Sequence, residues 1–308
     1  MSLTVVARRI ADVLARAPDE TPRLTALEPA AAPARALAVD GSSVVLAEAG
    51  DHLLAAYRAG AVGVERGRPL APRVPNAEVV FLAKLHARDA VAAKLEEDGF
   101  PAAGVPRLST GEALDALRTI EEMRAALAVL EGLDAGDLLL LDGALQARGH
   151  IPMLERVLAR ALERGVDVVG VCKSTSMTIG AAPAIVACQL AGRSFPSKTW
   201  WAPLPPRASV RGASFAARLS PAEERVFRFD IASSDATVLA SLAGLCGHPA
   251  YPGYPSPLAM AHNAVLLNDD ARRRLLAQVQ EAAIAAGADA RAWEAAFVDY
   301  HDILELGA

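Results

Sequence analysis

Two apolar runs that each end in an aspartate constrain the fold of this chain most. ALAVDGSS (36–43) and LLLLDGAL (138–145) each place four apolar residues before Asp-Gly, at Asp40 and Asp142. A continuous apolar run of this length is typical of a strand that is covered on both faces, as in a sheet packed between helices. We therefore expect two buried strands, each with a carboxylate at its end, where the sheet meets solvent.

The other patterns along the chain predict a mixture of strands and helices. Strand-like segments follow at 43–49, 55–67, 77–85, 166–173 and 226–232, the last with one wet face. Apolar residues at helical spacing predict helices at about 3–16, 86–97, 110–131, 151–164, 234–245, 257–268 and 270–286, and a short one at the end of the chain. Asp40-Gly41 is also a turn signal, so the segments 36–40 and 43–49 could pair as a hairpin. The order of elements favours the α/β class, with a mixed sheet flanked by helices.

Composition and cysteine usage narrow the class of protein. The 308 residues are 53% hydrophobic and 22% charged, which is typical of a soluble globular chain, and we expect a single domain over 1–308. The three cysteines are far apart and form no C-x-x-C pair, which argues against a zinc site or a disulfide framework and fits the cytoplasm. No signal-peptide core and no run of about 18 apolar residues is present, so we expect no membrane span.

A local basic region interrupts this acidic chain, whose formal net charge is -5. The segment 193–222 carries no Asp or Glu, is rich in proline, and is interpreted as a long loop. Its basic residues are Arg193, Lys198, Arg207, Arg211 and Arg218. Trp200 and Trp201 lie within it, either exposed for stacking on unpaired bases or anchoring the loop to the core. We predict nucleic-acid contacts at Lys173, Trp200, Trp201, Arg207 and Arg211.

Further polar residues could join the two aspartates in a site. Glu121 and Glu122 lie in the helix before Asp142, where a solvated helix face is the alternative to a metal ligand. Tyr254 and His262 lie in YPGYPSPLAMAH, with His262 placed as a ligand, a proton donor or a capping residue. Lys173 ends a buried strand in GVCKSTS and suits a phosphate, but no glycine precedes it directly, so an ATP-binding loop is excluded. Neighbouring carboxylates bind hard divalent cations through oxygen.

Taken in order, ALAVDGSS, LLLLDGAL, VVGVCKST and GYPSPLAMAH resemble the NurA family, the nuclease partner of the HerA translocase in DNA end resection. The resemblance implies an RNase H-like fold, manganese binding, and cleavage of single- and double-stranded DNA. It places the catalytic site at Asp40, Glu122, Asp142, Tyr254 and His262. By the same resemblance, two Mn²⁺ ions (or Mg²⁺) would be held by Asp40, Glu122, Asp142 and His262.

Two points of the resemblance stay open at this stage. The segment between the helix glutamate and Asp142 is longer than the family pattern, which leaves Glu121 as the alternative to Glu122. The resemblance also implies a homodimer that docks on a HerA-like hexameric ATPase, consistent with the lack of any ATP loop in this chain.

Other classes of function remain to be weighed. The acidic charge and the amphipathic N-terminal pattern would also suit a non-catalytic RNase H-like adaptor that binds DNA or a translocase. A phosphatase-like metal hydrolase of small phosphate esters is a further alternative, but the long basic segment with its tryptophans favours a polymer.

Overall fold

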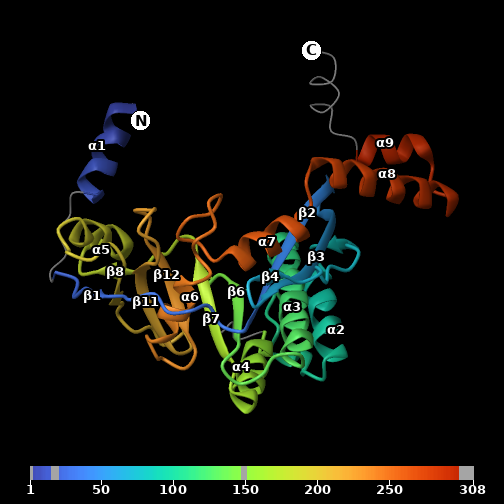
Figure 1. Ribbon diagram of the computed structural model, residues 1–308. Helices are drawn as coiled ribbons and strands as arrows, with labels where there is room; N and C mark the ends of the chain where they lie inside the picture. The colour runs from blue at the N-terminus through green and yellow to red at the C-terminus, as the bar shows by residue number, and fades with distance from the viewer. Residues whose placement is uncertain (1–2, 15–20, 147–150, 298–308) are drawn as a thin grey trace.

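A mixed sheet forms the centre of the protein in the computed structural model, which describes residues 3–14, 21–146 and 151–297 (Figure 1). The strands follow the order β1-β10-β11-β12-β7-β6-β2-β3-β4, and β5 pairs with β3. β2, β6 and β7 run parallel to one another, and the remaining pairs of this sheet are antiparallel. The bounds are β1 Thr25–Ala26, β2 Arg35–Ala49, β3 His52–Glu65, β4 Arg68–Pro69, β5 Glu78–Ala83, β6 Leu138–Asp142, β7 Asp167–Cys172, β10 Trp200–Pro203, β11 Ala213–Arg218 and β12 Phe227–Ile231.

Helices cover both faces of this sheet, which confirms the expected α/β class. The first face packs on α2 (Ala87–Glu97), α3 (Thr110–Leu130) and α4 (Met153–Arg164), with the short helix η1 (Ala102–Gly104) beside α2. The second face packs on α6 (Val238–Ala243) and α7 (Ser256–Val265). Side chains of a strand alternate between faces, so Leu37 and Val39 of β2 join the first core, and Ala36 and Ala38 join the second. The predicted helices over 86–97, 110–131 and 151–164 are confirmed within a few residues.

β2 and β3 form one long hairpin, which corrects the prediction for the first aspartate. β2 continues without a turn through Asp40 and Gly41 and pairs with β3 along nearly its whole length. The reversal comes at Gly50, whose positive φ of 57° suits a tight turn. Asp40 therefore lies within a strand rather than at its end, and the predicted hairpin between 36–40 and 43–49 is wrong. Asp142 is the last residue of β6, as predicted.

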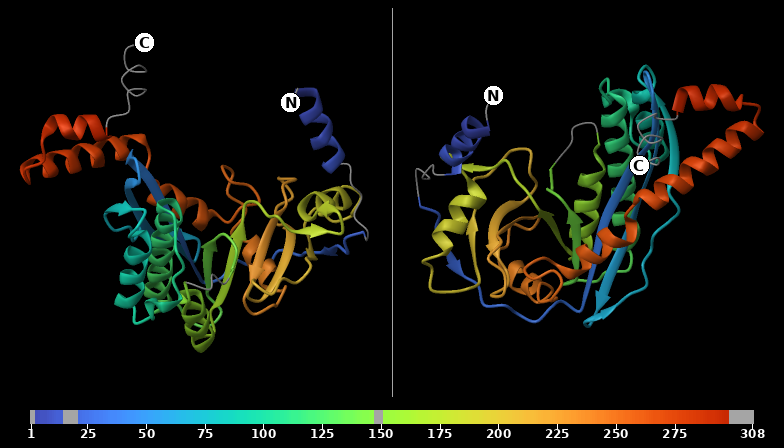
Figure 2. Two further views of the ribbon diagram at one scale, coloured as in Figure 1. Left: turned by 180° about the vertical axis from the view of Figure 1, so that it is seen from behind. Right: turned by 90° about the horizontal axis from the view of Figure 1, so that it is seen from above.

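Further helices lie at the two ends of the molecule (Figures 1 and 2). α8 (Asp269–Ala285) and α9 (Ala290–Phe297) pack on the far part of the β2–β3 hairpin through a separate small core. At the opposite end lie α1 (Leu3–Leu14), α5 (Ala184–Gly192) and the pair β8 (Thr178–Ile179) and β9 (Ala182–Pro183). The last two residues of the helix predicted over 3–16 lie outside the described residues. None of the described helices is long and apolar enough to cross a membrane.

The basic segment 193–222 is more regular than predicted. It contains β10 and β11, which pair with each other and extend the sheet, so the prediction of one long loop is wrong. β12 also differs from its prediction, because all five of its residues are buried rather than one face being wet. Its Arg228 and Asp230 form a buried ion pair, which lets two charged residues lie inside the sheet.

Candidate carboxylate site between β2, β6 and α7

Asp40 and Asp142 lie side by side on adjacent parallel strands. The register of β2 and β6 pairs Val39 with Leu141, so the next residue of each strand, Asp40 and Asp142, stands opposite the other. Because side chains alternate along a strand, both carboxylates point to the face covered by α7. Asp40 is almost fully buried, with 2% of its surface exposed, whereas the side chain of Asp142 is partly open to solvent.

Three polar side chains from later parts of the chain close on these aspartates. His262 of α7 places Nδ1 2.9 Å from Oδ2 of Asp40. The hydroxyl of Tyr254 donates to Oδ1 of Asp142 over 3.3 Å, and Nζ of Lys173 donates to Oδ2 over 3.2 Å. Proline near the start of α7 and an edge-to-face contact between Tyr254 and Phe227 fix the segment that brings Tyr254 and His262 here. Residues predicted from separate motifs thus converge.

Glu122 reaches β2 from the opposite face, at Gly41. It lies on α3, is buried, and forms an ion pair with Arg118 one turn earlier. A Cβ atom on Gly41 would collide with Cγ and Oε1 of Glu122, so only glycine at this position leaves room for the carboxylate. Glu121 points elsewhere: its carboxylate lies 3.3 Å from Lys94 and 2.6 Å from Arg124. Of the two glutamates, Glu122 is therefore the one beside Asp40.

Burial and mutual repulsion destabilise the charged forms of these carboxylates. Burial raises the pKa of Asp40 above its usual range, and the neighbouring Asp142 raises it further, against the contacts with His262 and the Gly41 amide. Burial raises the pKa of Glu122 to about 7, with Arg118 opposing and the two aspartates adding to the rise. Carboxylates crowded in this way are stabilised by an added positive charge.

The donor set can be compared with what a divalent cation needs. In the part of the chain that the structure describes, no group of three or more His, Cys, Asp or Glu side chains is close enough to hold a metal ion. Each carboxylate is paired with a group of the chain instead: Glu122 with Arg118, Asp142 with Lys173, and Asp40 with His262. The chemistry of the donors nevertheless fits a hard divalent cation, because the carboxylates of Asp40 and Asp142 lie side by side, Asp40 is paired with a histidine rather than a lysine or arginine, and His262 offers a nitrogen beside them. Metal ligation by Asp40, Glu122, Asp142 and His262 stays a prediction.

Two cavities make the site reachable from solvent on either side of Lys173. One, of about 580 Å³, is lined by Lys173, Tyr254 and His262, together with residues of the 223–227 and 250–252 segments. The other, of about 700 Å³, is lined by Asp142, Lys173 and the residues that follow β6 and β7. Lys173, which pairs with Asp142, therefore lines both openings.

Among the residues predicted to contact nucleic acid, only Lys173 lies at the carboxylate site. Trp200 is 1% exposed within β10, so the prediction of an exposed, stacking Trp200 is wrong and the anchoring alternative holds for it. Trp201 is partly exposed and packs edge-on against Phe215. Arg207 donates to the Ser176 carbonyl, and Arg211 is paired with Glu155. Binding of nucleic acid by Trp201, Arg207 and Arg211 is untested.

Sequence reasoning overlooked two residues of this site. Arg118 was not singled out, although it stands four residues before Glu122, the spacing at which helical side chains of opposite charge meet. Gly41 was interpreted as part of a turn signal, whereas the structure places a glutamate of the protein against it. Neither residue carries a signal that local sequence alone would separate from an ordinary helix or turn.

A mixed sheet with helices on both faces and carboxylates on its adjacent central parallel strands belongs to the RNase H-like class. The fold is that of the NurA nuclease from Sulfolobus solfataricus: the two chains superpose with a TM-score of 0.62 at 14% sequence identity, over 94% of this chain and 96% of that one. The NurA-like fold implied by the resemblance is confirmed.

Other comparisons add less. Endonuclease V from Ciona intestinalis, solved in complex with DNA containing an inosine followed by a ribo-adenosine, is a more remote neighbour. Its TM-score is 0.42 at 14% identity, over 90% of this chain and 99% of that one. No family model matches the sequence, and no curated protein does.

Proposed function

We propose that this protein is a metal-dependent DNA nuclease that hydrolyses phosphodiester bonds at the Asp40–Asp142 site. The observation that carries the proposal is the convergence of Asp40, Asp142, Tyr254, His262 and Lys173 from separate segments on one solvent-accessible point of the sheet. The confirmed NurA-like fold supports it, because the protein of that fold is a nuclease. The cations would be two Mn²⁺ ions, or Mg²⁺, held by Asp40, Glu122, Asp142 and His262.

The chain's own residues can position a phosphodiester. Bound cations would supply an activated water and charge stabilisation. The ammonium of Lys173 donates to Asp142 and lines both cavities. It would reach an oxygen of a scissile phosphate that is bound between these cavities. Burial raises the pKa of Tyr254 well above its usual range, so its hydroxyl stays protonated and serves as a hydrogen-bond donor to the substrate.

The wider role follows from the same proposal. A nuclease of this kind would act on single- and double-stranded DNA in end resection and double-strand break repair. Its partners would be a second copy of the chain and a HerA-like hexameric ATPase that supplies translocation, all in the cytoplasm.

The experiment is a cleavage assay with matched variants. End-labelled single- and double-stranded DNA is incubated with the protein and Mn²⁺, with and without EDTA, and in parallel with free nucleotides. We expect cleavage of the polymers only, its abolition by EDTA, and its loss in Asp40→Asn and Asp142→Asn. Asp134→Asn is the control, because its side chain is strongly exposed and it precedes β6, at the strand end opposite to Asp142. Equal cleavage by the wild type and Asp40→Asn would overturn the proposal.

One observation favours a second function, a non-catalytic adaptor that binds DNA or a translocase. Arg118 and Lys173 neutralise two of the carboxylates within the chain, which would suit a site that no longer holds metal. Calorimetry separates the two proposals. A nuclease should bind Mn²⁺ with a heat that Asp40→Asn removes, and an adaptor should show no such heat while retaining DNA or translocase binding.

A further inference from the structure

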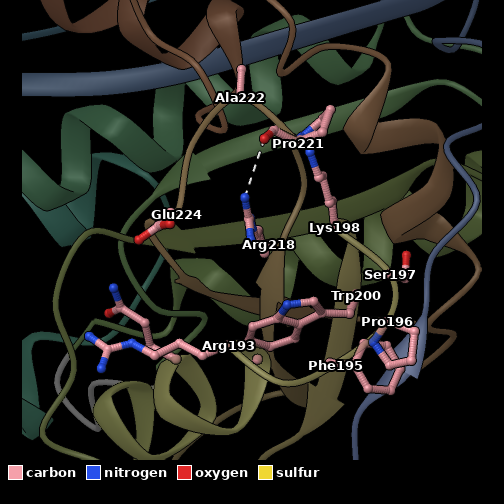
Figure 3. A pocket seen from close by; sticks show the side chains of 12 residues that line it. Arg193, Phe195, Pro196, Ser197, Lys198, Trp200, Arg218, Pro221, Ala222 and Glu224 are labelled. Carbon is pink, nitrogen blue, oxygen red and sulfur yellow. Dashed lines mark hydrogen bonds between the residues drawn. The ribbon is translucent and has the colours of Figure 1, made fainter.

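A pocket far from the carboxylate site is built from the basic segment. Its volume is about 510 Å³, and it lies between α5, β10 and the end of β11. Figure 3 shows Arg193 and Glu224 on one side and Lys198 on the other, with Arg218 and Trp200 between them. Three cationic side chains therefore face a single carboxylate, so the pocket has an excess of positive charge.

In the part of the chain that the structure describes, no ion pair engages the cations of this pocket. Arg193 and Lys198 are exposed, and their side chains form no hydrogen bond among the described residues. Arg218 donates only to carbonyl oxygens, those of Pro221 and Glu223, and so keeps its charge uncompensated. Uncompensated guanidinium and ammonium groups around one cavity favour an anion there.

Trp200 supplies a second, independent sign of a missing ligand. Its Nε1 is the one buried side-chain nitrogen or oxygen atom that lacks a hydrogen-bond partner in the part of the chain that the structure describes. Leaving such a donor buried and unpaired costs about 1–3 kcal/mol. The indole lines the pocket, and Figure 3 shows its nitrogen on the ring edge toward Arg218. Gly192 makes this position possible, because a Cβ atom there would collide with the indole.

The pocket and the carboxylate site open on the same edge of the sheet. β11 runs in the direction of β6 and β7, so Arg218 at the end of β11 lies at the edge where Asp142 and Lys173 lie. Arg218 is separated from Asp142 by three strand spacings across the sheet and by three residues along the strand direction. The distance between the two residues is therefore on the order of 15–20 Å. The segment 221–225 forms a shared wall, since Pro221, Ala222 and Glu224 line this pocket and Glu223 and Arg225 line the cavity at Tyr254.

We propose that this pocket binds a phosphate group of the nucleic-acid strand whose scissile bond lies at Asp142. The inference rests on the proposed nuclease function and adds a phosphate-binding subsite to it. The ligand is a nucleotide phosphate, because the pocket offers charged donors and an indole N–H and is larger than a bare phosphate needs. The separation of about 15–20 Å spans a few nucleotides of one strand, because the backbone winds around the axis while it rises about 3.4 Å per nucleotide. The phosphate belongs either to the end of the strand or to its interior.

The indole N–H of Trp200 gives a direct readout that needs no metal and no cleavage. The chain has three tryptophans, so its ¹⁵N-correlated spectrum has three indole signals, and Trp201→Phe and Trp293→Phe assign the third to Trp200. With EDTA present, we expect the Trp200 signal to shift on addition of inorganic phosphate and of a short 5′-phosphorylated oligothymidylate. A shift with the 5′-hydroxyl strand as well identifies an internal phosphate, and a shift with the phosphorylated strand alone identifies a terminal one.

Paired charge variants complete the test. Arg193→Gln/Lys198→Gln should remove the shift, weaken strand binding about tenfold at low salt, and reduce the salt slope of log K by about two. Lys84→Gln/Arg291→Gln removes the same charge from exposed positions elsewhere and should change neither. The subsite is overturned if no anion shifts Trp200, if the pocket variant shifts like the wild type, or if inorganic phosphate binds but no strand does. Because these measurements omit metal and cleavage, they stand even if the cleavage assay fails.

Discussion

Asp40 and Asp230 are two buried aspartates on central strands, and their surroundings differ. Asp230 is fully buried and receives two hydrogen bonds from Arg228, one from the Ser214 hydroxyl and one from the Leu145 amide. Asp40 has only the Gly41 amide and a half-exposed His262, and it faces a second carboxylate. A buried carboxylate that is neutralised by an arginine and accepts four hydrogen bonds serves the fold, whereas one that lies beside a second carboxylate and is paired with a histidine is available to a ligand.

The largest effect is expected for activity on replacing Asp40. Asp40→Asn removes a charge that would hold the cations, so cleavage should fall by about 1,000-fold or more, which corresponds to ~4 kcal/mol in transition-state stabilisation. Single-turnover cleavage of labelled DNA measures it. Asp230→Asn, assayed per folded molecule, should retain activity within about threefold of wild type. Equal losses in the two variants would remove the distinction between the two aspartates.

The free energy of unfolding should show the reverse order, with a larger loss for Asp230→Asn than for Asp40→Asn. Asp230→Asn leaves Arg228 without its anion in a buried position, and breaking a buried pair typically costs about 3–5 kcal/mol. We expect the lower end, about 3 kcal/mol in the free energy of unfolding, because the one amide oxygen of asparagine can still accept from either the Ser214 hydroxyl or the Leu145 amide. Urea denaturation measures it. Adding Arg228→Met should recover part of the loss, and Asp40→Asn should destabilise far less.

The sequence predicted the position of Asp142 better than that of Asp40. Asp142 was placed correctly at a strand end, because an apolar run followed by Asp-Gly describes β6 well. The same pattern failed at Asp40, where β2 runs on for nine residues, because the pairing of β2 with β3 outweighs a local turn signal. The glycine is needed there for Glu122, a contact between positions 81 residues apart that no local pattern encodes.

The strand containing Asp230 shows a second limit. Its alternation of Phe with Arg and Asp predicted a wet face, but the segment after β6 reaches that face, where the Leu145 amide donates to Asp230, and the two charges neutralise each other. Arg228 and Asp230 stand two apart and so share a face, which is a signal that pairing inside the sheet was possible. Burial itself depends on strand order, which the sequence did not provide. The helices were predictable from their apolar period, and the central parallel strands from their continuous apolar runs.

A loss of activity of intermediate size is expected at one of the two adjacent glutamates of α3, Glu121 and Glu122. Glu122→Gln should lower cleavage about 100-fold, because Glu122 lies behind Asp40 in the crowded carboxylate group. Glu121→Gln is the matched control and should stay within about threefold, since Glu121 is engaged in partly buried ion pairs with Lys94 and Arg124, away from Asp40. Parallel cleavage assays with both variants decide it. A larger loss in Glu121→Gln would assign the role to the other glutamate.

The smallest effect is expected at Lys173, the cation that now compensates Asp142. Lys173→Met should reduce kcat about tenfold if the ammonium moves to the substrate phosphate, and Lys173→Arg should restore part of it because the charge is kept. Lys84→Met, which removes a more exposed lysine, is the control. If Lys173 only neutralises Asp142, its loss should instead tighten Mn²⁺ binding and leave kcat unchanged. Asp142 is paired with Lys173, whereas Asp40 is paired with His262. A Mn²⁺ titration of Lys173→Met therefore shows whether the cation has to displace Lys173 from Asp142 when it binds.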